Sequence, residues 1–205
     1  HASEPVEKAA ILQGIGAACA AIGMDAEAAD AFGDALACVP SDPAVLAALF
    51  TEMERQGAVT RVVDFVRGAV GGMADKGAAN AIRTQAAARL ASSGEVRSAI
   101  ELLQDALGDR EDDPEAIRVM IDLSRQVEDW ERHVAALKLA VLHIYTDVDE
   151  RADAMLDCAR ISAGKLEDQA AAVHCYREVL ALRPLDPTAL DVLSGLLERS
   201  GDKEG

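Results

Sequence analysis

Apolar residues recur along most of the chain at spacings of three and four positions, the spacing that places side chains on one face of an α-helix. The stretch through Leu46, Leu49, Phe50 and Met53 is a clear example, because a helix there would carry all four on one side. This pattern predicts a protein built from amphipathic helices.

An Asp-Pro dipeptide occurs three times, and its prolines, Pro43, Pro114 and Pro187, are 71 and 73 residues apart. These separations are about twice a period of roughly 34–37 residues, which is typical of a solenoid of helix pairs. Proline ends the preceding helix because it lacks an N–H, and the aspartate before it caps the next helix. Each dipeptide therefore predicts a helix start.

A finer pattern surrounds two small residues, Ala28 and Ala172, each followed by an aromatic residue at +4, an apolar residue at +7 and a proline at +12. These followers are Phe32, Ala35, Pro40, Tyr176, Val179 and Pro184. With Gly16 twelve residues before Ala28, the arrangement resembles the tetratricopeptide repeat, a helix–turn–helix unit of about 34 residues. The resemblance implies an all-α fold, a right-handed solenoid of about five helix pairs plus a C-terminal helix.

The resemblance divides the chain into residues 1–8, read as a tag remnant or N-terminal extension, and one solenoid domain, 9–205. The expected units are 9–42, 43–76, 80–113, 114–147 and 152–186, followed by a terminal helix, 187–199. In the first unit the helices are expected near 8–21 and 25–38. The fourth unit departs from the pattern, because His133 stands where the small residue belongs.

The composition fits this architecture. The chain has 41 alanines but only 3% aromatic residues, and alanine favours helices. Its net charge of −16 argues against nucleic-acid partners, and no apolar run is long enough for membrane insertion. The four cysteines form no C-x-x-C pair and are expected to be reduced core thiols, which favours a cytoplasmic location.

No motif predicts chemistry, so the chain is expected to be no enzyme and to bind no metal or cofactor. The glycines around Gly71 lack the Gly-Lys-Ser/Thr of a phosphate loop and are expected to end a helix early. The acidic cluster before Pro114 lacks the glycine and glutamate of a calcium loop. Trp130 is expected to pack at the turn of the fourth unit, with a partner hot spot as the alternative.

The resemblance also implies a binding site, because ligands of such solenoids commonly lie in the concave groove lined by the first helix of each unit. The candidate peptide-binding residues are Gln13, Ala17, Ala47, Thr51, Thr84, Ala88, Arg118, Asp122, Arg125 and Arg160. The other positions that the resemblance places along the groove are Ala10, Ala20, Ala21, Ala44, Glu54, Arg55, Ala81, Ala91, Ser92, Glu115, Gln126, Asp153, Leu156 and Ala163. In the N-terminal half these side chains are small and nearly uncharged, which suits a helix or an extended peptide. An alternative is that the alanines only allow close helix packing.

The predicted function is a non-catalytic scaffold, a bacterial-type repeat protein that binds a protein or peptide in this groove. The acidic charge favours a partner with a basic patch. The alternative is self-association, or a regulatory region of a larger multidomain protein. A homo-oligomer would then form through Leu190, Leu193 and Leu197 of the terminal helix, unless that helix caps the array or the array continues beyond it.

Overall fold

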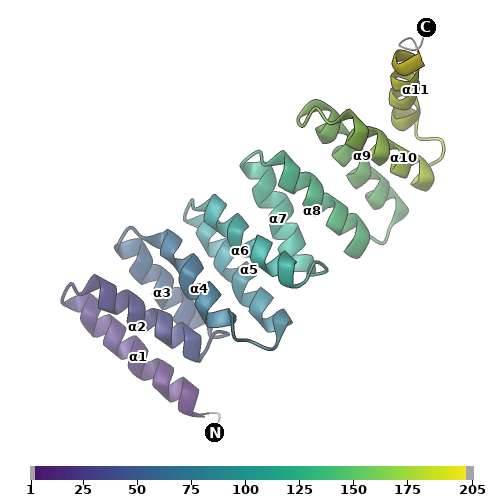
Figure 1. Ribbon diagram of the computed structural model, residues 1–205. Coiled ribbons are helices and arrows are strands. Elements are labelled where there is room, and N and C mark those ends of the chain that lie inside the picture. Colours follow the sequence, from purple (N-terminus) through teal and green to yellow (C-terminus); the bar gives the residue numbers. More distant parts are fainter. Residues whose placement is uncertain (1–2, 202–205) are drawn as a thin grey trace. The chain divides into compact units, whose positions relative to one another are not determined.

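The computed structural model describes residues 3–201, which form helices and contain no strand (Figure 1). The chain divides into two compact units, His1–Val119 and Met120–Gly205. The first contains α1 (Ser3–Ala21), α2 (Asp25–Cys38), α3 (Pro43–Arg55), the short 3₁₀ helix η1 (Val59–Arg61), α4 (Val62–Val70), α5 (Lys76–Ser92) and α6 (Val96–Asp109). Helix α7 (Pro114–Gln126) crosses the boundary.

The second unit continues with α8 (Trp130–His143), α9 (Val148–Gly164), α10 (Gln169–Leu182) and α11 (Pro187–Gly201). Consecutive helices pack as pairs, α1 with α2 and α5 with α6 in the first unit, and α9 with α10 in the second. Helix α2 also contacts α3 and α4, and α10 contacts α11. The predicted all-α fold of tetratricopeptide-like helix pairs is confirmed.

The three Asp-Pro dipeptides begin helices as predicted. Pro43, Pro114 and Pro187 are the first residues of α3, α7 and α11. In each case the preceding aspartate accepts hydrogen bonds from backbone N–H groups of the first turn, at 2.8 Å for Asp42 and 3.0 Å for Asp186. These bonds satisfy donors that have no partner within the helix.

Gly16 and Phe32, two residues of the repeat pattern, are in contact in the first helix pair. A Cβ atom on Gly16 would lie 3.0 Å from two ring carbons of Phe32, so the ring packs directly on the backbone of α1. Ala28 and Phe32 are buried, and so are Ala172 and Tyr176, which occupy the same two pattern positions in the pair of α9 and α10. The glycine-rich stretch also behaves as predicted, since α4 ends at Val70 and α5 begins only at Lys76. Residues 3–8, which were assigned from the sequence to an N-terminal extension, form the first part of α1.

The turn between the two helices of each pair contains one residue with a left-handed backbone. Gly23, Gly57 and Gly94 occupy this position with φ of 78°, 64° and 87°, and Glu128 and Glu167 occupy it with φ of 56° and 55°. Glycine adopts this conformation without steric cost, whereas a residue with a Cβ does not. The two glutamates therefore hold strained positions in an otherwise regular turn.

We expect Glu128→Gly to raise the free energy of unfolding by up to about 1 kcal/mol, because glycine relieves this strain. Gly94→Ala is the matched reverse change and should lower it by about 1 kcal/mol, since its Cβ meets no atom within 4 Å and only the backbone is strained. Urea denaturation followed by circular dichroism measures both. A Glu128→Gly variant less stable than the parent would contradict this explanation.

All four cysteines are free, and they fall into two classes of exposure. Cys19 and Cys38 are partly exposed, whereas Cys158 and Cys175 are buried in the core shared by α9 and α10. Burial raises the pKa of the Cys158 thiol to about 12 and also raises the pKa of Cys175. A thiol with such a pKa is almost never a thiolate at neutral pH, so these two groups should be inert.

A thiol reagent added to the folded protein at pH 7 should therefore modify Cys19 and Cys38 within minutes and leave Cys158 and Cys175 unmodified. In denaturant all four should react, because burial is what protects the pair. Mass spectrometry of the digested protein identifies each site. Modification of Cys158 as fast as Cys19 in the folded state would contradict the buried placement.

His133 and Trp130, singled out in the sequence, lie at the start of α8. His133 is buried, and its Nδ1 lies 3.0 Å from the carbonyl oxygen of Ile121 and 3.3 Å from the Ser124 hydroxyl. The Trp130 ring meets His133 edge to face at 6.0 Å, and the ammonium of Lys165 lies 5.2 Å from the Trp130 ring centre. Both side chains thus have structural partners within the second unit.

Candidate functional site

The predicted groove residues lie on the helices that the repeat pattern assigned to them. Helix α1 carries Gln13 and Ala17, α3 carries Ala47 and Thr51, α5 carries Thr84 and Ala88, α7 carries Arg118, Asp122 and Arg125, and α9 carries Arg160. All are exposed or partly exposed except Thr84, which is buried. The side chain of Arg160 lies 3.4 Å from Asp157 of its own helix.

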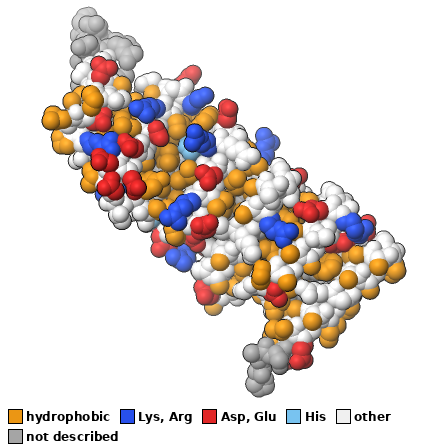
Figure 2. Space-filling view, turned by 180° about the vertical axis from the view of Figure 1, so that it is seen from behind, with side chains coloured by type: hydrophobic (Ala, Val, Ile, Leu, Met, Phe, Trp, Pro, Cys, Tyr) orange, Lys and Arg blue, Asp and Glu red, His pale blue; other side chains and the backbone are white. Residues whose placement is uncertain are grey.

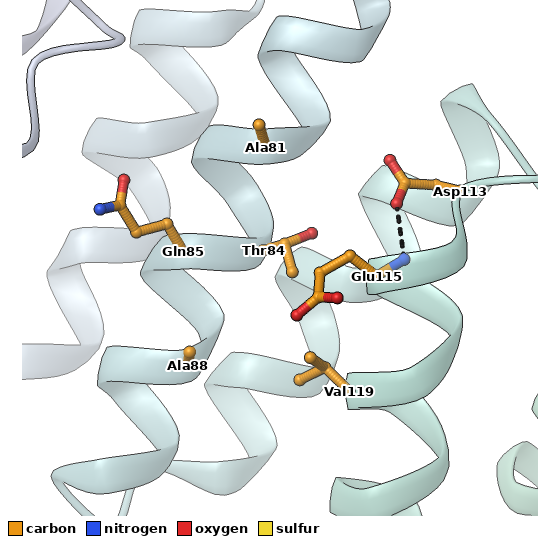
Figure 3. A pocket seen from close by; sticks show the side chains of 7 residues that line it. All are labelled: Ala81, Thr84, Gln85, Ala88, Asp113, Glu115 and Val119. Atoms are coloured by element: carbon orange, nitrogen blue, oxygen red, sulfur yellow. Dashed lines mark hydrogen bonds between the residues drawn. The ribbon is translucent and has the colours of Figure 1, made fainter.

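The structure brings part of this set together in a pocket between α5 and the first half of α7, inside the first unit (Figure 3). Its volume is about 310 Å³, at the lower end of the range for ligand pockets. The lining residues are Ala81, Thr84, Gln85, Ala88, Asp113, Glu115 and Val119. This size fits a side chain or a short peptide segment better than a large cofactor.

One wall of the pocket is apolar, and its two alanines lie about two helical turns apart on α5. Ala81 and Ala88 project from α5, and Val119 faces them from α7 (Figure 3). Because the two alanines have only a methyl group each, they leave space that larger side chains would fill. Both alanines are exposed to solvent at this place.

Thr84 adds a polar group without a partner to this wall. The residue is 6% exposed, and its hydroxyl oxygen has no hydrogen-bond partner. In Figure 3 the side chain points from α5 toward α7. The usual solution on a helix is seen at Thr51, whose hydroxyl donates to the carbonyl oxygen of Ala47 at 2.9 Å. A buried hydroxyl left unpaired costs roughly 1–3 kcal/mol, so a ligand group that pairs with it would gain from doing so.

Two carboxylates border the opposite side of the pocket. One oxygen of Asp113 accepts hydrogen bonds from the N–H groups of Glu115 and Ala116, both at 3.1 Å, and so caps α7. The nearby Arg110 pairs with Asp112 instead, at 3.2 Å. Among the described residues, neither Asp113 nor Glu115 pairs with a cation of the chain. The pocket therefore presents two carboxylates without an ion-pair partner beside an apolar wall.

Sequence reasoning placed Ala81, Thr84, Ala88 and Glu115 in the groove and missed Gln85, Asp113 and Val119. Asp113 was read only as a helix cap, which it is, although its residual charge also faces the pocket. Gln85 and Val119 each lie four residues after a predicted groove residue, and helical spacing alone would have found them.

The wider surface shows a second feature. Over α1, beside the lower grey residues of Figure 2, the surface is mostly hydrophobic and uncharged. The exposed large apolar side chains of α1 and of the turn that follows it are Val6, Ile11, Ile15, Ile22 and Met24. The sequence from residue 9 to residue 24 contains no charged residue, which is unusual in so acidic a chain.

Within residues 3–201 there is no group of three or more side chains that could hold a metal ion. In the same part of the chain, every helix is too short or too polar to cross a membrane.

No protein-family profile and no curated protein matches the sequence. Solved structures are similar at low identity. YrrB, described as a TPR protein with an unusual peptide-binding site, has 16% identity and a TM-score of 0.40, with 94% of this chain and 95% of that chain covered. A tetratricopeptide repeat protein from Parabacteroides merdae has 15% identity and a TM-score of 0.40, with 95% and 74% covered. MamA from Desulfovibrio magneticus has 17% identity and a TM-score of 0.37, with 87% and 97% covered.

The assignment of the fold rests on the chain's own helices. Capped helix starts at the three Asp-Pro dipeptides, a left-handed turn residue in each pair, and the packing of Phe32 on Gly16 all follow the repeat pattern. The chain is an all-α protein of tetratricopeptide-like helix pairs.

Proposed function

We propose that this protein is a non-catalytic scaffold that binds a segment of another protein, and that the segment lies against α5 and α7 in the first unit. The observation that carries the proposal is the pocket lined by Ala81, Thr84 and Ala88, where a buried hydroxyl has no partner. A protein segment supplies both side chains for the apolar wall and polar groups for the hydroxyl.

The chemistry of the pocket favours binding over catalysis. An activated nucleophile needs a base within hydrogen-bond distance, and the Thr84 hydroxyl has no such neighbour. The other polar side chains are one amide, Gln85, and two carboxylates. We also propose a reducing, cytoplasmic compartment, because all four thiols are free.

A displayed peptide library selected on the immobilised protein tests the proposed function. Ala88→Arg places a long side chain in the pocket at an exposed position. It should therefore raise the dissociation constant of the selected peptides by about tenfold or more without unfolding the protein. Ala37→Arg is the control, because it makes the same change at an exposed position on α2. Peptides that bind both variants equally, or no selected peptides at all, would refute the proposal.

Self-association is a second candidate, and the exposed apolar surface of α1 is the observation that favours it. Ile11 and Ile22 are 64% and 72% exposed. The sequence predicted that self-association would use the terminal helix, α11. There Leu190 is 42% exposed and Leu193 is partly buried. The side chain of Leu197 lies outside the described residues. Light scattering should then give a dimer mass that Ile11→Asp reduces to the monomer mass. A monomer at all concentrations would exclude it.

A further inference from the structure

We propose that the pocket between α5 and α7 receives an arginine side chain of the bound segment. This inference rests on the proposed function and specifies which residue the partner must present. It follows from three features of the pocket that lie on different residues: two carboxylates without an ion-pair partner, an unpaired hydroxyl and an apolar wall.

The charge of the pocket selects a cation. The carboxylates of Asp113 and Glu115 border it, and neither forms an ion pair within the described chain. Of the cations nearest in sequence, Arg110 and Arg83 have other partners, and Arg118, one helical turn after Glu115, is exposed and forms no ion pair with either carboxylate among the described residues. Arg110 pairs with Asp112, and Arg83 donates to Asp109 at 2.7 Å and to the side-chain oxygen of Asn80 at 3.0 Å. An incoming cation would therefore meet negative charge without displacing an internal partner.

The unpaired hydroxyl indicates that the cation carries hydrogen-bond donors into the pocket. The Thr84 oxygen can accept a hydrogen bond, but it has almost no accessible surface, so the side chain must rotate about its Cα–Cβ bond to present it to a ligand. The side chains of Thr84 and Glu115 extend from α5 and α7 toward the same space in Figure 3. A group that donates in several directions from one plane could serve both the hydroxyl and a carboxylate oxygen.

The apolar wall favours arginine over lysine. The guanidinium group is planar, carries five donors and is more weakly hydrated than an ammonium group, so it loses less on entering a site with apolar walls. Its three methylene groups can lie along Ala81, Ala88 and Val119 while its head reaches the oxygens. Arginine thus matches all three features, whereas lysine offers a compact charge that stays hydrated.

The test uses a small probe, so that no natural partner is needed. N-acetyl-arginine-N-methylamide is titrated into the protein, and the methyl signals of Ala81, Thr84, Ala88 and Val119 are followed by NMR. The citrulline counterpart has nearly the same shape without the charge, and the lysine counterpart has the charge without the planar head. We expect shifts of these methyl signals that saturate with the arginine probe, are weaker with lysine and are absent with citrulline.

Two variants assign the effect to the proposed groups. Glu115→Gln removes the charge from an exposed side chain and should raise the dissociation constant of the arginine probe by about tenfold. The control is Glu27→Gln, a change at an exposed glutamate on α2, which should leave the dissociation constant unchanged. Thr84→Val keeps the shape and removes the hydroxyl. It should weaken binding of the probe several-fold and should raise the free energy of unfolding, because a buried hydroxyl without a partner is lost.

Unmoved methyl signals, equal shifts with citrulline, or tighter binding of lysine would each overturn the arginine proposal. These outcomes are distinct from failure of the proposed function, which the peptide selection with Ala88→Arg decides separately. Selected peptides that need Ala88 but contain no arginine would leave the scaffold function standing and contradict this inference alone.

Discussion

Phe50→Ala should lower the free energy of unfolding by about 3–5 kcal/mol, the largest loss expected from a single substitution in the first unit. Phe50 lies on α3, is fully buried, and has the guanidinium group of Arg89, on α5, 4.9 Å from its ring centre. Alanine would remove the ring from the core and leave a cavity that the surrounding helices cannot fill. Urea denaturation followed by circular dichroism measures the loss.

Two further variants separate packing from the cation–π contact. Phe50→Leu keeps most of the volume and should cost about 1–2 kcal/mol. Arg89→Met should lower the free energy of unfolding by about 0.5–1 kcal/mol in the parent protein. It should lower it by less in the Phe50→Leu background, because the ring that Arg89 contacts is already absent there. A loss below about 1 kcal/mol for Phe50→Ala would show that this ring is not part of the core.

Gly33→Ala should destabilise the protein by about 1–3 kcal/mol, although alanine is the better helix former. A Cβ on Gly33 would lie 2.2 Å from Cδ1 and 2.5 Å from Cε1 of Phe65, a side chain of α4. These distances are too short for any pair of carbon atoms, so α2 and α4 would have to move apart or the ring would have to leave its site. Thermal and urea denaturation should both report the loss.

Gly68→Ala is the matched control, because Gly68 is a helical glycine of α4 with no atom within 4 Å of its added Cβ. It should be neutral or stabilising by up to about 1 kcal/mol, as helix propensity alone would give. Combining Gly33→Ala with Phe65→Leu should restore part of the lost stability, since a leucine can turn away from the new methyl group. Equal effects of the two alanine substitutions would contradict the close contact.

The sequence was sufficient to predict the helix starts, and its repeat spacing also accounts for the contact between Gly16 and Phe32. Asp42 and Asp186 act through atoms of their own helix turns, and such local signals do not depend on the rest of the fold. The contact between Gly16 and Phe32 was predictable for a related reason, because both residues belong to one helix pair whose spacing repeats along the chain. Local chemistry and periodicity carried these predictions.

Other features depend on distances between helices and could not be predicted in this way. The close approach of Gly33 to Phe65 joins two helices, α2 and α4, that belong to different repeat units. The turn residues Glu128 and Glu167 were missed because the usual signal for a left-handed turn is glycine. Glutamate can take its place only where the surrounding helices compensate for the strain.

In the pocket, too, some features could be predicted from the sequence and others could not. Repeat positions indicated Thr84, Ala88 and Glu115 as groove residues, but periodicity gives no information on whether a hydroxyl finds a partner. That property depends on how far α5 lies from α7 and on which rotamer the side chain adopts. Ser162 of α9 also has a buried hydroxyl without a partner, but among the residues that line this pocket Thr84 is the one with such a hydroxyl.

Photo-crosslinking from within the pocket tests the central claim most directly. Gln85 is exposed and lines the pocket, so a benzophenone amino acid at position 85 would reach a bound segment, whereas the same group at position 37, on α2, would not. With a library-selected peptide, the account predicts a crosslink from position 85 that an excess of unlabelled peptide removes, and none from position 37. Crosslinks from position 37 alone, or equally from both positions, would contradict it.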